Sequence, residues 1–451
     1  MMKGVPTNKS DDGPGPAPPL SWGRAFERLR QGIQWSALGT IINQGSTFIV
    51  SVIAARILGR ETFGGYAIVL STIVTLSNIA QLGMGYTTTK FVAELRETDR
   101  TRAGRVLGMG TVVSILAACL SAFILAVGAR TLASEGYRAP QLAPALTIAA
   151  GVLFFAVMNG FLVGALCGLE AFRTVGYAGA ASGAIYVTIC LLGTRLGGLE
   201  GLVAGMALSG VLQWAILQWC VGFECTRQRI RISAAGLWSE WPLLSRFAMP
   251  AMMSGASYMG AMWGANTLLV RQAGGLSQFA LLSAATNFWT ILVFFPNVIN
   301  NVGMAMLNNR RAAGAFDECR RIFWATIAIN AVLLSCGGGM LSVWAPECLR
   351  LFGQGFSGGA TALRVLVVSA VAYALWCSVT QVMSSAGGMW RVFLLGALPR
   401  DVVIVASATI LTASWGAGGV AAAVALGWTC GLIATVPLAW RSVLVRPLGT
   451  S

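Results

Sequence analysis

Residues 142 to 166, LAPALTIAAGVLFFAVMNGFLVGAL, contain no charged side chain. A helix needs roughly 20 mostly apolar residues to cross the hydrocarbon core of a bilayer, and this stretch is long enough. Its residues do not alternate between apolar and polar, as the strands of a membrane barrel do. Because backbone in hydrocarbon must satisfy its own hydrogen bonds, the stretch predicts a membrane-spanning α-helix.

Similar apolar stretches follow one another along the whole chain. Only 10% of its residues are charged, against about 25% in soluble globular domains. Spanning helices are expected near residues 35 to 58, 66 to 89, 106 to 128, 142 to 166, 174 to 194, 198 to 222, 247 to 270, 278 to 304, 322 to 345, 361 to 385, 392 to 413 and 416 to 440. The sequence therefore predicts an all-α polytopic membrane protein with about 12 transmembrane helices.

The two halves of the chain show an internal correspondence. Residues 172–173, FR, precede residues 201–204, GLVA, while residues 390–391, WR, precede residues 419–422, GVAA, at an offset of 218 residues. Chance agreement among small residues is the alternative explanation. Parallel repeats of this kind favour two pseudo-symmetric six-helix bundles with a substrate cavity between them.

The spans and the repeat divide the chain into five expected segments. The first 19 residues are rich in proline and glycine and lack the apolar core of a signal peptide, so we expect a retained, disordered tail. The segments are residues 1–34, a cytoplasmic disordered tail and interfacial helix; 35–222, an N-terminal six-helix bundle; 223–246, a cytoplasmic linker; 247–440, a C-terminal six-helix bundle; and 441–451, a cytoplasmic tail.

Lysine and arginine are distributed unevenly between alternate loops. With a cytoplasmic N-terminus, 22 of the 31 lie in cytoplasmic segments and seven lie outside, while Arg56 and Arg400 fall within spans. The positive-inside rule then predicts that both termini are cytoplasmic. The net charge of +15 is spread over loops that face anionic lipid. We therefore expect the phospholipid bilayer, and no nucleic acid, as a partner.

Cysteine and histidine usage gives no sign of a metal site. The ten cysteines are scattered without a CxxC pair, and the chain has no histidine. Most of the thiols fall in apolar runs, where cysteine behaves as a small hydrophobe. The expected outer connections are too short for a catalytic domain. We expect no metal, no cofactor and no enzymatic activity.

Two glycine spacings predict close contact between helices. Gly201 and Gly205 have the small-xxx-small spacing that lets helix backbones approach in membranes, and the glycines near Gly183 offer the same possibility. Neither spacing indicates a substrate.

The first quarter of the chain carries a more specific pattern. Its elements are ARILG at 55–59, FG at 63–64 before YA at 66–67, LGMG at 82–85 and KFVAE at 90–94, followed later by GLEAFR at 168–173. Together they resemble the signature of the polysaccharide (O-antigen/exopolysaccharide) flippases of the multidrug/oligosaccharidyl-lipid/polysaccharide (MOP) exporter superfamily. The resemblance implies a MOP/MATE-like transporter fold.

The resemblance also implies a function. Such a protein is a bacterial inner-membrane flippase that moves lipid-linked oligosaccharide, usually on undecaprenyl diphosphate, to the periplasmic leaflet by alternating access. Its product would supply lipopolysaccharide, capsule or exopolysaccharide assembly, with polysaccharide polymerase machinery as a possible partner. The alternative on the same scaffold is an ion-coupled exporter of drugs or small metabolites. Proton relays usually need intramembrane carboxylates, and Asp401 is the only clear one, which disfavours that alternative.

A diphosphate cargo calls for positive charge and hydrogen-bond donors in a low-dielectric cavity. Arg56, toward the outer end of the first helix, and Arg400 beside Asp401, deep in the eleventh, are therefore candidate cavity residues. Snorkelling to the headgroups is the alternative for Arg56. A position at the cytoplasmic interface is the alternative for the other two.

Further candidates have less specific patterns. Lys90, Arg271 and Arg364 flank span ends, where they would gate the cavity, recruit the diphosphate or simply anchor the topology. Intramembrane amides are candidate ligands for sugar hydroxyls, with interhelical hydrogen bonding as the alternative. The amides singled out are Asn43, Asn78 and Gln81.

Overall fold

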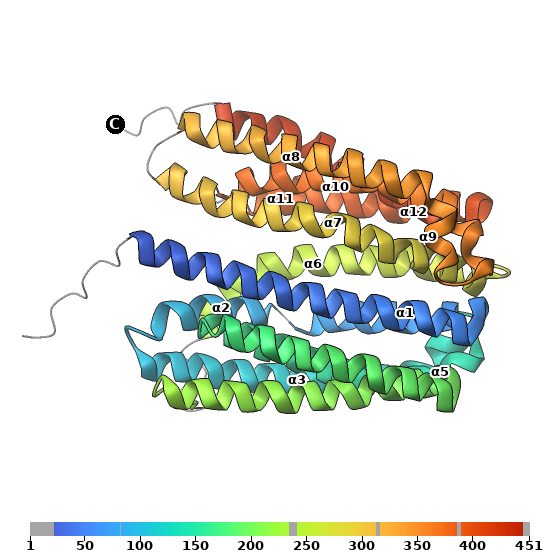
Figure 1. Cartoon of the computed structure of the whole chain (residues 1–451), viewed down its shortest axis with the longest axis horizontal. Coiled ribbons are helices and arrows are strands. Elements are labelled where there is room, and N and C mark those ends of the chain that lie inside the picture. Colours follow the sequence, from blue (N-terminus) through green and yellow to red (C-terminus); the bar gives the residue numbers. More distant parts are fainter. Residues whose placement is uncertain (1–21, 82, 234–240, 313–315, 386–388, 445–451) are drawn as a thin grey trace, which may run out of the picture.

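The computed structural model describes residues 22–81, 83–233, 241–312, 316–385 and 389–444. These residues form helices and connecting turns, with no strand among them. The helices pack side by side in two bundles, drawn in blue to green and in yellow to red in Figure 1. The expected disordered tail, seven residues of the expected linker and most of the expected C-terminal tail lie outside the described residues.

The N-terminal bundle contains five helices and two short single-turn elements. They are α1 (Trp22–Ala80), α2 (Met84–Leu95), α3 (Arg100–Thr131), the π-helical η1 (Leu132–Gly136), the 3₁₀-helical η2 (Pro140–Leu142), α4 (Ala143–Gly168) and α5 (Phe172–Arg227).

The C-terminal bundle is built in the same way. It contains α6 (Trp241–Val270), α7 (Gly275–Ala312), α8 (Phe316–Val343), α9 (Ala345–Arg350), the 3₁₀-helical η4 (Gln354–Gly359), α10 (Ala360–Ser385), α11 (Met389–Val392), the π-helical η5 (Phe393–Ala397) and α12 (Leu398–Leu444).

Eight stretches of the described residues are long and apolar enough to cross a membrane. Three of them, in α1, α5 and α12, contain a turn where the backbone is not helical, at Gly59, Gly198 and Gly416 respectively. Each therefore supplies two crossings. Together with the 30-residue α6, this makes twelve crossings in the described part of the chain. The predicted all-α fold with about 12 spans is confirmed.

The internal repeat is confirmed by the geometry of two hairpins. Gly198 has φ 56° and ψ −130°, and Gly416, 218 positions later, has φ 52° and ψ −124°. Side chains other than glycine rarely adopt this backbone, so each turn depends on its glycine. After each turn a glycine meets the preceding helix: Gly201 contacts Gly193, and Gly419 contacts Leu411, again at the same offset.

The predicted close helix contacts are also present. A carbon at the Cβ position of Gly201 would lie 2.9 Å from the carbonyl carbon of Gly193, and one at Gly205 would lie 3.1 Å from Cys190 Cα. One at Gly183 would lie 2.6 Å from Ser46 Oγ of α1. The obstacle is backbone at Gly201 and Gly205, which leaves no room for a side chain there, whereas at Gly183 the serine side chain would have to move.

Several helix ends differ from the expected spans. α1 is helical from Trp22 to the Gly59 turn, so the expected interfacial helix is continuous with the first span. The second span is broken before Met84, where Gly83 has φ 66°. α5 runs on to Arg227, into the region expected to be a linker. The bundles are joined mainly by α1, which packs against α6 and α7, and by α2, which packs against α6.

Candidate functional site

Two arginines of α1 reach across to the C-terminal bundle near the Gly59 turn. Arg56 Nε donates a hydrogen bond to the backbone oxygen of Leu351 at 2.7 Å, and Arg60 Nε donates one to that of Ser277 at 3.1 Å. The first acceptor follows α9, and the second lies in the first turn of α7. We call the end of the molecule with the Gly59 turn the turn end, and the contacts between the bundles there the seam.

Five phenylalanine side chains from both bundles pack together in the seam. The rings of Phe48 and Phe63 lie 5.9 and 6.0 Å from that of Phe352. Phe288 of α7 lies 5.5 Å from Phe48, and Phe356 of η4 lies 5.7 Å from Phe63. Edge-on and tilted ring pairs contribute about 0.5–1.5 kcal/mol each beyond the area they bury. The cluster therefore stabilises the closed seam.

A second group of polar contacts joins α1 to α6. Trp263 Nε1 donates to the hydroxyl of Tyr137 at 2.9 Å, and that hydroxyl lies 2.6 Å from Thr72 Oγ1. Asn266 Nδ2 donates to Ser71 Oγ at 3.1 Å. Thr72, Tyr137 and Asn266 are buried, and a buried polar group that loses its partner is costly. When the bundles separate here, these polar groups need new hydrogen-bond partners.

Gly64 is the point of closest approach between α1 and α7. A carbon at its Cβ position would overlap the carbonyl oxygen of Leu276 and lie 2.6 Å from the carbonyl carbon. The obstacle is backbone of the other bundle, which cannot rotate away as a side chain can. Only glycine at this position allows the seam to close as observed.

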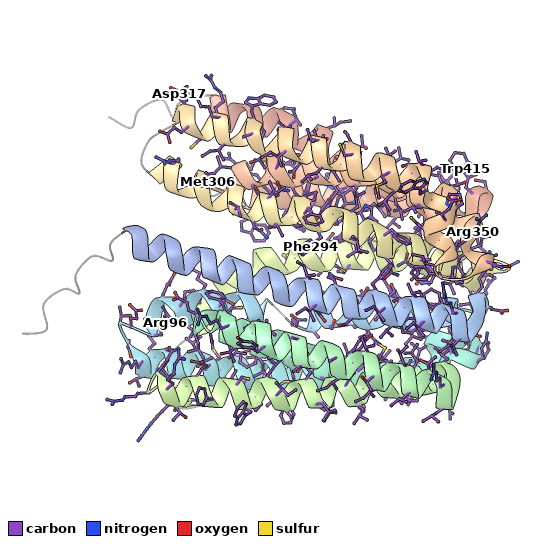
Figure 2. All side chains as sticks on the ribbon, in the orientation of Figure 1. Arg96, Phe294, Met306, Asp317, Arg350 and Trp415 are labelled. Atoms are coloured by element: carbon purple, nitrogen blue, oxygen red, sulfur yellow. The ribbon has the colours of Figure 1, made fainter. Side chains whose placement is uncertain are left out.

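The halves of α1 and α7 away from the turn end present exposed side chains. Ile41 and Asn43 of α1 are exposed, as are Asn301 and Met306 of α7. Figure 2 shows Met306 on the part of α7 farthest from the turn end. At this end the bundles are in contact through α2 and α6. Within the described residues, the bundles are thus sealed by rings and arginines at the turn end, while α1 and α7 carry mixed polar and apolar surface at the other.

Arg400 and Asp401 form an ion pair inside the C-terminal bundle. Arg400 Nε donates to Asp401 Oδ1 at 2.7 Å, and the two side chains are only 3% and 4% exposed. The guanidinium carbon lies 4.4 Å from the ring centre of Trp428, 4.7 Å from that of Tyr258 and 4.9 Å from that of Trp376. Three aromatic rings on three helices therefore surround the cation.

The carboxylate of Asp401 also accepts a hydrogen bond from another helix. Ser257 of α6 donates its hydroxyl to Asp401 Oδ2 at 2.6 Å. α11 begins at Met389, and the helical path continues through η5 into α12. At 1.5 Å per residue, Arg400 therefore lies roughly 16 Å from the start of α11. Neighbours on a helix point about 100° apart and do not face each other, yet here they bond. In this state the pair faces the interior of its own bundle.

The other predicted cations occupy two places. Arg271 directly follows α6, and Arg364 of α10 donates Nε to the backbone oxygen of Ser342 at 3.0 Å; both are exposed at the turn end. Lys90 is exposed on α2, with Nζ 5.1 Å from the ring centre of its neighbour Phe91. The structure does not bring these three together.

The predicted amides lie away from the turn end. Asn43 is exposed on α1, and Asn78 is exposed with Nδ2 donating to the backbone oxygen of Val74 at 2.7 Å. Gln81 packs against Gly160 of α4. A carbon at the Cβ position of Gly160 would lie 2.6 Å from Gln81 Oε1. The predicted site residues are thus divided between the turn end, the interior of the C-terminal bundle and the opposite half of α1. Only Arg400 and Asp401 contact each other.

Sequence reasoning missed several residues of the seam. It gave no individual role to Arg60 or Gly64, although FG at 63–64 is part of the family signature. Tyr137 and Trp263 carried no signal, because they are 126 residues apart in the chain.

Twelve crossings in two pseudo-symmetric bundles, joined by the seam at the turn end and through α2 and α6 at the other, have the layout of a transporter of the MOP/MATE architecture. The sequence profile of the family described as "Polysaccharide biosynthesis protein" matches residues 29–304. The chain belongs to this family.

Two curated relatives are similar over most of their length. The chain is 22% identical over 396 residues to the "EPS I polysaccharide export inner membrane protein EpsE" of Ralstonia nicotianae, covering 86% of this chain and 88% of that protein. It is 21% identical over 397 residues to the protein of the same description from Ralstonia solanacearum, with the same coverage.

Solved structures share the fold at low identity. An inward-facing multidrug resistance MATE family transporter of the MOP superfamily has a TM-score of 0.75 at 16% identity, covering 93% of this chain and 98% of that one. The eukaryotic MATE transporter AtDTX14 has a TM-score of 0.73 at 15% identity, covering 92% and 96%. Together with the family match, these establish a multi-pass transporter of the MOP superfamily.

Proposed function

We propose that this protein flips lipid-linked oligosaccharide, carried on undecaprenyl diphosphate, across the inner membrane of a bacterium for surface polysaccharide assembly. The observation that carries the proposal is the seam of breakable contacts between the two bundles, the hydrogen bonds of Arg56 and Arg60 among them, in a chain of the polysaccharide biosynthesis family. Transporters built from parallel repeats work by rocking their two bundles around a central site. A seal at one end, made from bonds that can break, is what one state of such a cycle requires.

The location and orientation follow from the relatives and the loop charges. The EpsE proteins are described as inner membrane proteins of polysaccharide export. The positive-inside count supports cytoplasmic termini, and with that orientation the turn end would be periplasmic. In this proposed orientation the seam lies toward the periplasm.

The cargo would occupy the region between the bundles on the cytoplasmic side of the seam. We assign to this region the exposed amides Asn43 and Asn301 and the exposed apolar side chains Ile41 and Met306 of α1 and α7. An amphiphilic cargo needs both kinds of surface, because its glycan must be hydrogen-bonded while its lipid tail remains in the bilayer. Lys90 remains a proposed contact for the diphosphate, and Asn78 and Gln81 remain proposed contacts for sugar hydroxyls. Polymerase machinery is the proposed downstream partner.

A direct test is deletion of the coding gene, followed by analysis of surface glycan and of lipid-linked intermediates by leaflet. We expect loss of surface glycan and accumulation of the lipid-linked oligosaccharide in the cytoplasmic leaflet. Normal surface glycan without accumulation, in a strain lacking a second flippase, would refute the proposal. Drug sensitivity alone would instead support the exporter alternative; the likeness to MATE transporters shows the fold and does not favour that cargo.

A further inference from the structure

Arg56 and Arg60 differ from Arg350 and Arg364, two other arginines of the turn end, because they bond across the seam. Each uses Nε to donate to a neutral backbone oxygen of the other bundle. Within the described ranges neither has an ion pair. By contrast, Arg350 lies 3.8 Å from Glu347, and Arg364 bonds within its own bundle. Two cations thus stand at the contact between the bundles, and among the described residues each bonds a backbone carbonyl of the other bundle.

These two bonds cannot survive the opening of the seam. Their donors belong to α1, and their acceptors, Leu351 and Ser277, belong to the C-terminal bundle. When the bundles separate at the turn end, both guanidinium groups lose their acceptors together. They then lie four residues apart on either side of the Gly59 turn, at the mouth through which a cargo would leave.

A phosphate group is a better acceptor for a guanidinium than a backbone carbonyl is. It carries negative charge, and its oxygens match the planar fork of arginine in paired hydrogen bonds. We propose that Arg56 and Arg60 exchange acceptors during transport: they bind the carbonyls of Leu351 and Ser277 when the turn end is closed, and the diphosphate of the cargo when it is open. This inference rests on the proposed flippase function.

The exchange has a thermodynamic consequence. A ligand that binds one conformation better shifts the equilibrium toward it by its difference in affinity. Because Nε of each arginine is bonded to a carbonyl in the closed seam and released in the open one, the complete guanidinium fork is available to diphosphate only in the open seam, which diphosphate therefore favours. The cargo headgroup would hold the turn end open until it leaves with its lipid.

The test uses the full chain in nanodiscs of phosphatidylcholine. Spin labels on unnatural residues at Leu196 and Trp415, which are 88% and 64% exposed beside the turns of α5 and α12, report the separation of the bundles at the turn end. The probes are undecaprenyl diphosphate, undecaprenol, and phosphatidylglycerol as the phospholipid source of phosphate. We expect undecaprenyl diphosphate to increase the open-to-closed ratio by about fivefold or more, and the other two to leave it unchanged.

The double variant Arg56→Ala/Arg60→Ala separates the two roles. We expect a higher open fraction without ligand, because the bonds across the seam are lost, and no response to diphosphate. Arg56→Gln/Arg60→Gln, which keeps neutral donors, is expected to lose the response too, and guards against misfolding of the alanine variant. Arg195→Ala is the matched control: it removes an exposed arginine of the same bundle and end that makes no contact across the seam in the described residues.

Three outcomes overturn the inference. They are a diphosphate response that persists in both double variants, a wild-type chain that does not respond, and an equal response to phosphatidylglycerol, which would make the site a lipid-headgroup contact. Flipping of lipid-linked oligosaccharide is measured in proteoliposomes of the same protein. Flipping without a diphosphate-dependent opening rejects the exchange alone, whereas absence of flipping rejects the proposed function.

Discussion

Replacement of Gly64 by alanine is expected to hold the seam open. The added methyl group would overlap the carbonyl oxygen of Leu276 and lie 2.6 Å from its carbonyl carbon, where ordinary contacts begin near 3.4 Å. α1 and α7 must therefore move apart by roughly an ångström at their point of closest approach. Because the obstacle is backbone, rotation of a side chain does not relieve it.

The magnitude follows from the cost of overpacking. An extra methyl group in a tightly packed contact costs about 1–3 kcal/mol. Only the closed seam bears this cost, since the two backbones separate in the open state. The open-to-closed ratio should therefore rise by about 5- to 150-fold. This is enough to make a minor outward-open population the dominant one.

The assay is the distance distribution between labels at the two outer turns, together with the rate of flipping. We expect the long-distance population to grow and flipping to slow, because the variant is trapped in one state. Gly45→Ala is the matched control: it lies on the same helix, its Cβ position has no atom within 4 Å, and it gains the same helix propensity. If the Gly64→Ala distances matched those of Gly45→Ala, the assignment of the seam as a gate would be wrong.

Three other predictions concern the interior of the bundles and the orientation of the chain. Arg400→Ala or Asp401→Ala alone should destabilise the folded protein by about 3–5 kcal/mol, because each leaves one buried charge without its partner. Replacing both residues with apolar ones should destabilise it by less. Thermal unfolding in detergent measures this order, and a double variant less stable than both single variants would contradict the prediction. Gly193→Ala, which would place a carbon 2.9 Å from the carbonyl carbon of Gly201, should lower thermal stability while leaving the ratio of open to closed seams unchanged; a shifted ratio would show that the hairpin takes part in gating. A cysteine that replaces Leu196 should react with a membrane-impermeant maleimide added to intact spheroplasts, and a cysteine that replaces Glu97 should not. The reverse pattern would show that the chain has the opposite orientation.

The twelve crossings and the repeat could be predicted because both depend on the residues of short, continuous stretches of the sequence. Length and apolarity alone decide whether a stretch crosses a membrane. The correspondence between residues 201–204 and 419–422 marks two hairpins with the same turn geometry, at Gly198 and Gly416. Small residues at short spacings likewise predicted the contacts of Gly201 and Gly205, since helix approach depends on the size of the side chains at the contact.

The candidate site was much less accessible to sequence reasoning. Arg56 was singled out for its charge within a span, but its acceptor, Leu351, lies 295 residues away. Arg400 and Asp401 were recognised as intramembrane charges, yet nothing local indicated the tyrosine and two tryptophans around the cation. The cost of burying charge shows that such residues need partners, without showing which partners they have.

What the amino-acid sequence determined by itself is a helical membrane protein of two repeated halves in the polysaccharide biosynthesis family, because hydrophobicity, charge bias and motif spacing act over a few tens of residues. What only the tertiary structure decided is which end is sealed and by which groups. Arg60 and Ser277 meet 217 residues apart, and Trp263 and Tyr137 meet 126 apart. Such contacts form only where the two bundles pack against each other, and no periodicity along the chain indicates them.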